Sequence, residues 1–280
     1  MRWLGAMVVV AALSMVAVAA GAQDPEPQPA LAAGLSAGTM RWRGGLERQV
    51  LTAALAYQPH PWLTVLAAPT AVRMIPSDGP AASGPGDVPV SVGLNKQLRG
   101  TASPVLGAGL VVSLPVGSQS NAIGSGSVGW AVDAGAGVAP WERSLLYVSA
   151  SRDVAGARAG EGASVRYTSL GLDGALALSS RFTATASLAS DLTRSDSTAP
   201  LVRTAGGGFN LRLAGPLRLV ADVALGVNQD SPQWLFSIGL GTAYSGLSPM
   251  GLNNPGQQLK NTFGRVVPKP KPAPPKAGPG

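Results

Sequence analysis

The sequence of 280 residues contains no cysteine, a single histidine and few charged residues, which make up 12% of the chain. The absence of cysteine excludes disulfides and thiolate metal sites. An ordinary soluble domain carries roughly twice this share of charge. Hydrophobic residues make up 45% of the chain, yet after the amino terminus no apolar run approaches the ~18 residues of a membrane helix. This dispersed apolar character is expected where lipid-facing and lumen-facing side chains alternate along strands.

The formal net charge of +7 is concentrated in the last part of the chain. The basic residues after Ser245 have no acidic neighbours, and they are Lys260, Arg265, Lys269, Lys271 and Lys276. The central part is nearly balanced and has no basic stripe interleaved with aromatic residues. A nucleic-acid partner is therefore not expected.

The first residues have the organisation of a secretory signal peptide. Arg2 supplies a positive charge, Met7–Ala20 is a short apolar run, and Ala20-Gly21-Ala22 is a small-x-small cleavage site. We predict a signal peptide over 1–22, followed by a Pro-rich leader over 23–33. No cysteine follows the site, so a lipoprotein anchor is excluded.

From about residue 34 to residue 245 the chain alternates with a period of two, which is the geometry of a strand. The clearest case is WLFSIGLGTAYS, residues 234–245, where Trp234, Phe236 and Ile238 lie on one face and Ser237 and Gly239 on the other. We predict an all-β fold: a transmembrane antiparallel up-and-down β-barrel over 34–245.

Turn-forming residues divide this region into an even number of segments, as in bacterial outer-membrane barrels. The twelve predicted strands are 34–43, 48–57, 62–75, 87–98, 104–116, 127–139, 144–153, 164–178, 181–193, 201–213, 217–228 and 233–245. The eighth changes phase between Tyr167 and Leu170, which predicts a bulge or a shorter strand.

Tight connections alternate with longer polar or Gly-rich ones, and barrels of this class have short periplasmic turns and longer extracellular loops. Both termini are therefore expected in the periplasm. The aromatic residues predict interfacial girdles at the two ends. They are Tyr57, Trp62, Trp141, Phe182 and Tyr244 beside the tight turns, and Trp42, Trp130, Tyr147 and Trp234 at the other end.

The stretch YQPHPWLTVLAAPTAVRMI, the loop SDGPAASGPGD and the strand VPVSVGLNKQL, residues 57–98, resemble the family of putative transporters of the MetA pathway of phenol degradation. Gly86-Asp87, the Gly-Leu-Asn-Lys of 93–96 and LVVSLPVG of 110–117 match that pattern, but Gln97 replaces an aromatic residue. The resemblance covers about 48–245. It implies transport of small, often hydrophobic or aromatic compounds across the outer membrane, and no catalytic residues.

The last predicted strand resembles the signal read by the barrel-assembly machinery. Ser237, Gly239, Thr242 and Tyr244 have the expected spacing, although a bulkier residue is preferred at Thr242. That signal normally ends a protein, whereas here the residues 246–280 follow. They include VPKPKPAPPK, which favours extended polyproline II, so we predict a disordered, basic periplasmic tail.

Charged side chains on the inward phase of the predicted strands are the candidate lumen-lining residues, because an Arg facing lipid at the midplane costs ~2–4 kcal/mol. Asp87 and Arg181 lie near strand ends, where an interfacial position is the alternative. The candidates are Arg73, Asp133, Arg166, Asp191, Arg212, Arg218 and Asp222. They either pair across the lumen and close it, or line a path for small solutes.

The only histidine, His60, stands between two prolines in a predicted periplasmic turn. A barrel hydrolase needs a nucleophile or an activated water near a histidine, and a metal site needs more ligands than one imidazole. We therefore expect no enzyme, no cofactor and no metal.

Two functions remain open. The first is a passive channel for small compounds in the outer membrane. The second is a structural barrel with a closed lumen, whose tail binds peptidoglycan or a periplasmic protein. The expected partners of either are outer-membrane lipid and the barrel-assembly machinery.

Overall fold

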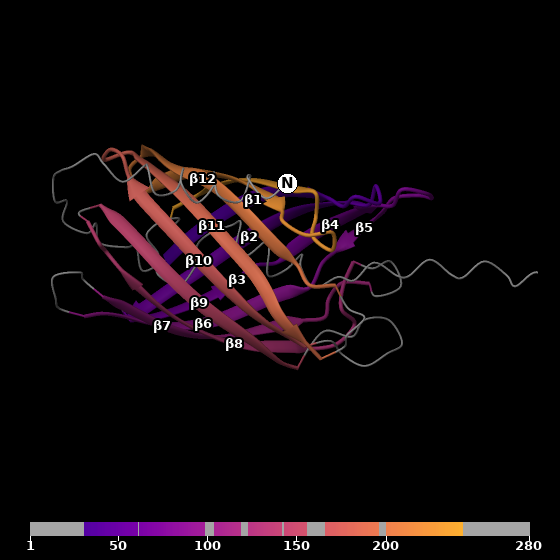
Figure 1. Cartoon of the computed structure of the whole chain (residues 1–280), viewed down its shortest axis with the longest axis horizontal. Helices are drawn as coiled ribbons and strands as arrows, with labels where there is room; N and C mark the ends of the chain where they lie inside the picture. The colour runs from indigo at the N-terminus through magenta and orange to yellow at the C-terminus, as the bar shows by residue number, and fades with distance from the viewer. Residues whose placement is uncertain are drawn as a thin grey trace, which may run out of the picture.

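The computed structural model describes residues 31–60, 62–98, 104–118, 123–141, 143–155, 166–195 and 200–242. The predicted signal peptide, most of the leader and the predicted tail lie outside them. Fourteen strands form one antiparallel sheet (Figure 1). They are β1 (Leu31–Arg41), β2 (Glu47–His60), β3 (Leu63–Ala67), β4 (Thr70–Ile75), β5 (Ala82–Pro85), β6 (Val88–Gln97), β7 (Val105–Leu114), β8 (Gly129–Val138), β9 (Ser144–Ala155), β10 (Tyr167–Ala177), β11 (Phe182–Arg194), β12 (Arg203–Ala214), β13 (Leu217–Gly226) and β14 (Trp234–Gly241).

The sheet closes into a barrel because β1 pairs with β14 on one side and with β2 on the other. β3 and β4 pair with successive parts of β2, so together they occupy one position in the ring. β5 pairs with β4 and β6 pairs with β3, and these two fill the next position. The ring therefore has twelve strand positions, which confirms the predicted barrel and its strand number.

The two positions that are each formed by two strands have short breaks next to each other, between β3 and β4 and between β5 and β6. Pro69 separates β3 from β4, and its carbonyl accepts a hydrogen bond from Ala53 N at 3.0 Å. Gly86 N donates to Thr70 O at 2.9 Å on the next position. A side chain at Gly86 would collide with Thr70 and Val72, so this close approach requires glycine. The first strand begins at Leu31, three residues before the predicted start and inside the predicted leader.

The connections alternate between the two ends of the barrel. At the turn end lie the short connections β2–β3, β8–β9, β10–β11 and β12–β13, together with β6–β7 and the start of β1. At the loop end lie β1–β2 and the mostly longer connections β4–β5, β7–β8, β9–β10, β11–β12 and β13–β14. The register of β10 with β11 shifts between Thr168 and Ser169 because β11 has an extra residue there, Leu192. β10 itself keeps one phase from Tyr167 onward, so the predicted bulge in the eighth strand is not found in it.

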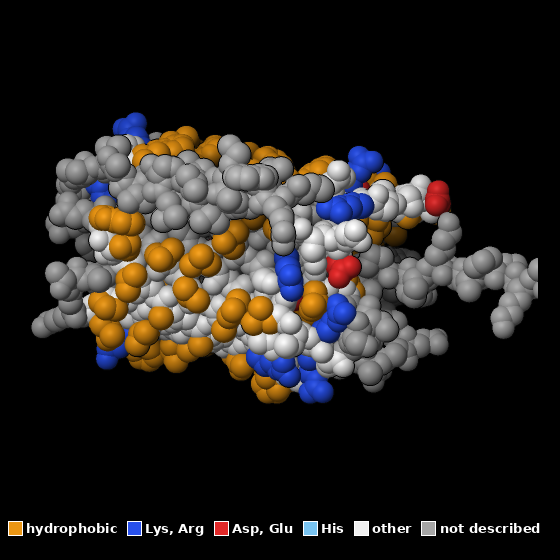
Figure 2. Space-filling view, in the orientation of Figure 1, with side chains coloured by type: hydrophobic (Ala, Val, Ile, Leu, Met, Phe, Trp, Pro, Cys, Tyr) orange, Lys and Arg blue, Asp and Glu red, His pale blue; other side chains and the backbone are white. Residues whose placement is uncertain are grey.

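Hydrophobic side chains cover the outer wall. On the face shown in Figure 2 they spread along the barrel, and Lys, Arg, Asp and Glu gather toward its ends, chiefly the right-hand end where Figure 1 labels β4 and β5. Exposed leucines and valines such as Leu35, Val148 and Leu225 belong to this wall. The alternation is clearest in β14, where Leu235 and Ser237 are buried and Phe236 and Ile238 are exposed.

Part of the predicted aromatic girdles is found on the outer wall. Tyr57, Trp62 and Trp141 are exposed at the turn end, and Trp130 is exposed near the loop end. Tyr147 is 5% exposed and faces the lumen. The prediction that it belongs to the aromatic girdle at the end away from the tight turns is therefore wrong. No helix is described in this chain, and hence none that is long and apolar enough to cross a membrane.

Candidate functional site: the barrel lumen

The inner wall of β7–β12 is built from small residues. Every second residue of these strands faces inward, and most are Gly, Ala, Ser or Thr. Examples are Gly107, Gly109, Gly135, Ser149, Ser151, Gly171, Thr185, Ser187, Gly206 and Gly208. A ring of twelve strands is wider than one that eight strands of larger side chains would fill. Small inward residues therefore leave space inside this ring.

Three carboxylates lie on the inner wall near the middle of the barrel, and we call Asp133, Asp173 and Asp222 the acid belt. They come from β8, β10 and β13. Tyr147 on β9 is within electrostatic reach of both Asp133 and Asp173. Asp222 is within reach of Asp173 and accepts a hydrogen bond from Thr185 on β11. The belt thus spans six neighbouring strands.

Glycines on the neighbouring strands make room for these side chains. Gly109 is directly across from Asp133 and Gly208 directly across from Asp222. A Cβ at Gly109 would contact the Asp133 carboxylate, and one at Gly208 would contact the Asp222 carboxylate. The carboxylates therefore lie along the wall instead of crossing the lumen.

The inward-facing basic residues lie at the two ends of the barrel. Arg212 and Arg218 are directly across from each other on β12 and β13 at the turn end. Arg212 Nε donates to Gly215 O at 3.0 Å. Arg48 lies at the loop end, and so does Arg194, which is opposite the buried Tyr167. Among the described inward residues, the middle of the lumen therefore carries negative charge alone.

The described part of the β7–β8 connection, residues 115–118 and 123–128, places Ile123 inside the loop end of the lumen. Asp87 holds its two ends together, because its carboxylate accepts hydrogen bonds from Gly117 N at 3.1 Å and Ser125 N at 2.7 Å. Arg48 Nη2 donates to Ile123 O at 3.4 Å. Arg48 is 2% exposed, and Asp87 is its electrostatic partner. We call this arrangement the loop clamp.

Ile123 packs beneath the loop clamp into an apolar cluster on the inner wall of β1, β2, β4 and β14. Ile123 is 1% exposed. The other buried members are Met40, Val50, Val72, Met74 and Leu235. These strands are on the opposite side of the ring from β8–β10. The lumen therefore has an apolar side near the loop end and an acidic side at mid-height.

Two further aspartates satisfy backbone groups at the loop end. Asp191 accepts hydrogen bonds from Ser169 Oγ at 2.6 Å and Val202 N at 2.9 Å. Asp153 is buried and accepts from Tyr167 N at 3.1 Å. Both face inward, but they tie strand ends together.

Five of the seven candidate residues predicted to line the lumen face inward, and they are Asp133, Asp191, Arg212, Arg218 and Asp222. Arg73 is a correction. It is exposed and shares the outer face of β4 with Ala71, while Val72 and Met74 on the other face are buried. The inward face of β4 is formed by Val72 and Met74, which belong to the apolar cluster with Ile123.

Arg166 is the second correction. It is exposed and precedes β10, and it is adjacent to the inward-facing Tyr167. Its N–H donates to Ser195 Oγ at 2.9 Å at the rim of the loop end. Because β10 alternates regularly and Tyr167 faces inward, the preceding Arg166 falls on the outward phase.

Sequence reasoning did not select four inward-facing charges, Arg48, Asp153, Asp173 and Arg194. Arg48 and Asp153 obey the alternation of their strands and could have been found from it. Asp173 shares the inward phase of β10 with Tyr167 and Gly171, a regular alternation that the predicted phase change between Tyr167 and Leu170 obscures.

The described residues contain no group of three or more His, Asp or Glu side chains placed to hold a metal ion. His60 ends β2 at the turn end, where its ring lies 4.7 Å from that of Trp62. Both side chains are exposed.

Comparison with solved structures finds similar barrels in the outer membrane. The COG4313 outer membrane channel from Pseudomonas putida F1 is 17% identical over 80% of this chain and 99% of that one, with a TM-score of 0.59. The NanC porin is 10% identical over 75% of this chain and 98% of its own, with a TM-score of 0.52. No family model and no curated protein matches the sequence. The chain shares the closed β-barrel fold of these outer-membrane proteins.

Proposed function

We propose that this protein is a passive channel for small compounds in the outer membrane. The observation that carries the proposal is the contrast between the two faces of one closed ring. The outer face exposes leucine, valine and aromatic side chains, which suits lipid. The inner face carries small and polar residues and the acid belt, which suits water and solutes.

In this proposal the turn end faces the periplasm and the loop end faces the outside, as is usual for barrels of this class. The alternation of connection lengths supports this orientation. β1 begins and β14 ends at the turn end. The tail over 246–280 then starts on the periplasmic side.

The charges of the lumen indicate which solutes pass more easily. The acid belt attracts cations to the middle of the path. The apolar cluster around Ile123 lies where a solute would enter from the loop end. We infer that small cations and compounds with an apolar or aromatic part are favoured over small anions.

The proposal is tested by reconstituting the full-length mature protein in planar lipid bilayers. We expect discrete single-channel currents in potassium chloride and swelling of proteoliposomes in small neutral solutes. Protein that is folded, as shown by a heat-modifiable gel shift, but passes neither ions nor solutes would rule out transport.

A second function is favoured by one observation, the insertion of the β7–β8 connection into the loop end. Ile123 is 1% exposed there, which is the packing of a plug. A barrel closed in this way would act as an anchor whose basic tail binds peptidoglycan or a periplasmic protein. Absence of flux together with cosedimentation of the intact protein with peptidoglycan would favour this function.

We also propose that the protein is not an enzyme, and His60 provides the test. His60→Ala should leave conductance and swelling rates within error of the wild type, because the imidazole is exposed beside Trp62 at the turn end and does not face the acid belt. Loss of solute passage in a folded His60→Ala protein would contradict this assignment and reopen a chemical role.

A further inference from the structure

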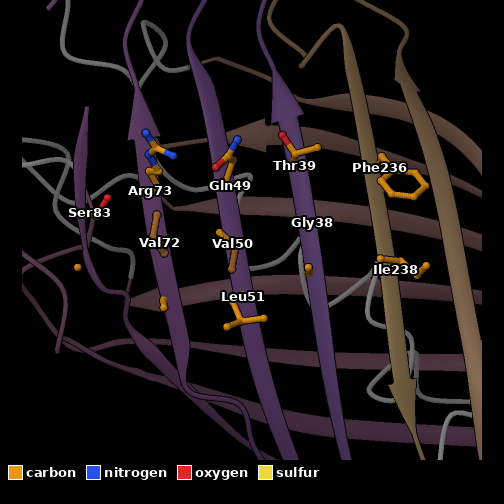
Figure 3. Close-up of a pocket in the computed structure, with 13 residues that line it drawn as sticks. Gly38, Thr39, Gln49, Val50, Leu51, Val72, Arg73, Ser83, Phe236 and Ile238 are labelled. Carbon is orange, nitrogen blue, oxygen red and sulfur yellow. The ribbon is translucent and has the colours of Figure 1, made fainter. Parts of the chain in front are cut away.

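The outer wall near the loop end carries a groove of about 590 Å³ across β5, β4, β2, β1 and β14 (Figure 3). Its lining residues belong mostly to the outward phase of their strands. The floor includes Ala37 and Ala71, and larger apolar side chains, Leu51, Phe236 and Ile238, stand beside them. The groove therefore opens to the lipid side of the barrel and not to the lumen.

A row of polar side chains crosses the upper part of this groove. Ser83, Arg73, Gln49 and Thr39 are directly across from one another on four adjacent strands. Figure 3 shows them side by side in the upper half of the view, with Leu51 and Ile238 lower down. The row is polar, whereas the neighbouring outward side chains Leu51, Phe236 and Ile238 are apolar.

Glu47 is the acidic member of this neighbourhood. Its Oε1 accepts hydrogen bonds from Gln49 Nε2 at 2.9 Å and from Thr39 Oγ1 at 3.3 Å. Arg41 is directly across from Glu47 on β1. The cations Arg41 and Arg73 therefore outnumber the one carboxylate, and the net charge of this part of the wall is positive.

The position of Arg73 along the barrel is unusual for a charged residue. Trp234, Arg41 and Glu47 form the row at the rim of the loop end, and Arg73 lies one row further toward the middle. An Arg on the lipid face costs free energy that falls toward the interface. Its long side chain lowers this cost when the guanidinium reaches the headgroup layer and meets an anion.

The groove below Arg73 is apolar and has the shape to hold the hydrocarbon part of an amphiphile. The Ala37 and Ala71 side chains leave a depression, and Leu51 and Ile238 give it apolar walls. An acyl chain lying there would run from the polar row toward the middle of the membrane. A cation above an apolar groove matches a phosphate joined to acyl chains.

We propose that this groove binds a phosphorylated, acylated glycolipid of the outer leaflet. Arg73 receives a phosphate, Gln49 and Thr39 contact the sugar, and one acyl chain occupies the depression beside Leu51 and Ile238. The lipid is placed in the outer leaflet because the groove lies near the loop end, which faces the outside in the proposed orientation. This inference rests on the outer-membrane location in the proposed function but not on transport.

The test uses the full-length mature barrel in detergent and bisphosphorylated lipid A as the probe. Native mass spectrometry measures lipid retention, and thermal unfolding measures the rise in Tm. We expect one lipid A to be retained by the wild type, and Arg73→Gln to weaken binding about tenfold or more, because hydrogen bonds to charged groups are the stronger ones. Fully dephosphorylated lipid A should bind the wild type as weakly as bisphosphorylated lipid A binds the variant.

Arg152→Gln is the matched control, since Arg152 is also exposed on the outer wall but lies on β9 and donates to Thr168 and Thr193. It should bind lipid A like the wild type. Ala71→Phe, which fills the depression without removing a charge, should also weaken binding. A folded Arg73→Gln protein that retains lipid A as the control does would overturn the proposal, and so would equal affinity for phosphatidylglycerol. Conductance is measured separately, so a failure here leaves the channel proposal intact.

Discussion

Replacing Asp87 with alanine should release the β7–β8 connection from the lumen and raise the single-channel conductance. The Asp87 carboxylate accepts the Gly117 and Ser125 N–H groups. These contacts help to hold the described parts of the connection together, alongside the hydrogen bonds from Ile123 N and Gly124 N to Ser118 O. Without them, Ile123 keeps its apolar contacts, the hydrogen bond from Arg48 to its carbonyl and the hydrogen bond from its N–H to Ser118 O. We expect openings of larger amplitude and more current noise than in the wild type.

The same substitution should lower the free energy of unfolding by about 2–4 kcal/mol, because hydrogen bonds to a charged acceptor contribute about 1.5–3 kcal/mol each and contributions do not add fully. The loss also removes the electrostatic partner of the buried Arg48, which adds to the cost. Urea unfolding in detergent micelles measures this change. Arg48→Met should give a similar increase in conductance, because it removes the bond to Ile123 O from the other side of the loop clamp.

Asp78→Ala is the control for both measurements. Asp78 is an exposed aspartate in the β4–β5 connection at the same end of the barrel. Its removal changes the net charge equally but touches no part of the loop clamp. If Asp87→Ala and Asp78→Ala proteins have the same conductance and the same stability, the inserted loop does not restrict the lumen.

Converting the acid belt to amides should remove most of the preference for cations. In the triple variant Asp133→Asn, Asp173→Asn and Asp222→Asn, the shape of the wall is kept and three negative charges are lost. A unit charge at several ångströms from an ion in water contributes on the order of 0.5 kcal/mol. Because each charge attracts potassium and repels chloride, the ratio of potassium to chloride permeability should fall by about tenfold or more at low salt.

Reversal potentials measured across a potassium chloride gradient give this ratio directly. The difference between the variant and the wild type should shrink at 1 M salt, because the Debye length is then about 3 Å. Asp78→Asn, which alters a carboxylate far from the belt, should leave the ratio unchanged. An unchanged ratio in the folded triple variant would show that ions do not pass along the acid belt.

Much of the inner wall follows from local alternation. The phase of 217–228 predicted that Arg218 and Asp222 face inward, and the structure places both there. The same rule does not place Arg73, because both faces of 62–75 carry apolar residues. The cost of an Arg in lipid then predicts the inner face, whereas Arg73 lies on the outer one. In the structure Val72 and Met74 face inward, in the same apolar cluster as Ile123 from a distant connection.

The acid belt shows a second limit. The inward direction of Asp133 and Asp222 could be predicted, but the glycines that receive their carboxylates could not. Gly109 is opposite Asp133 and Gly208 is opposite Asp222 because of the register between neighbouring strands. Register depends on how the whole ring closes, and no single segment contains that information.

The sequence by itself determined the class of fold, the twelve strand positions and the inward phase of most charged residues, because a period of two is a local property of an extended chain. The tertiary structure alone decided that Ile123 of the β7–β8 connection packs inside the lumen, where Arg48 and Asp87 hold the connection. It also decided that Arg73 faces the lipid side, beside Gln49 and Thr39. Each of these depends on contacts between segments far apart in the chain, and such contacts exist only after the ring has closed.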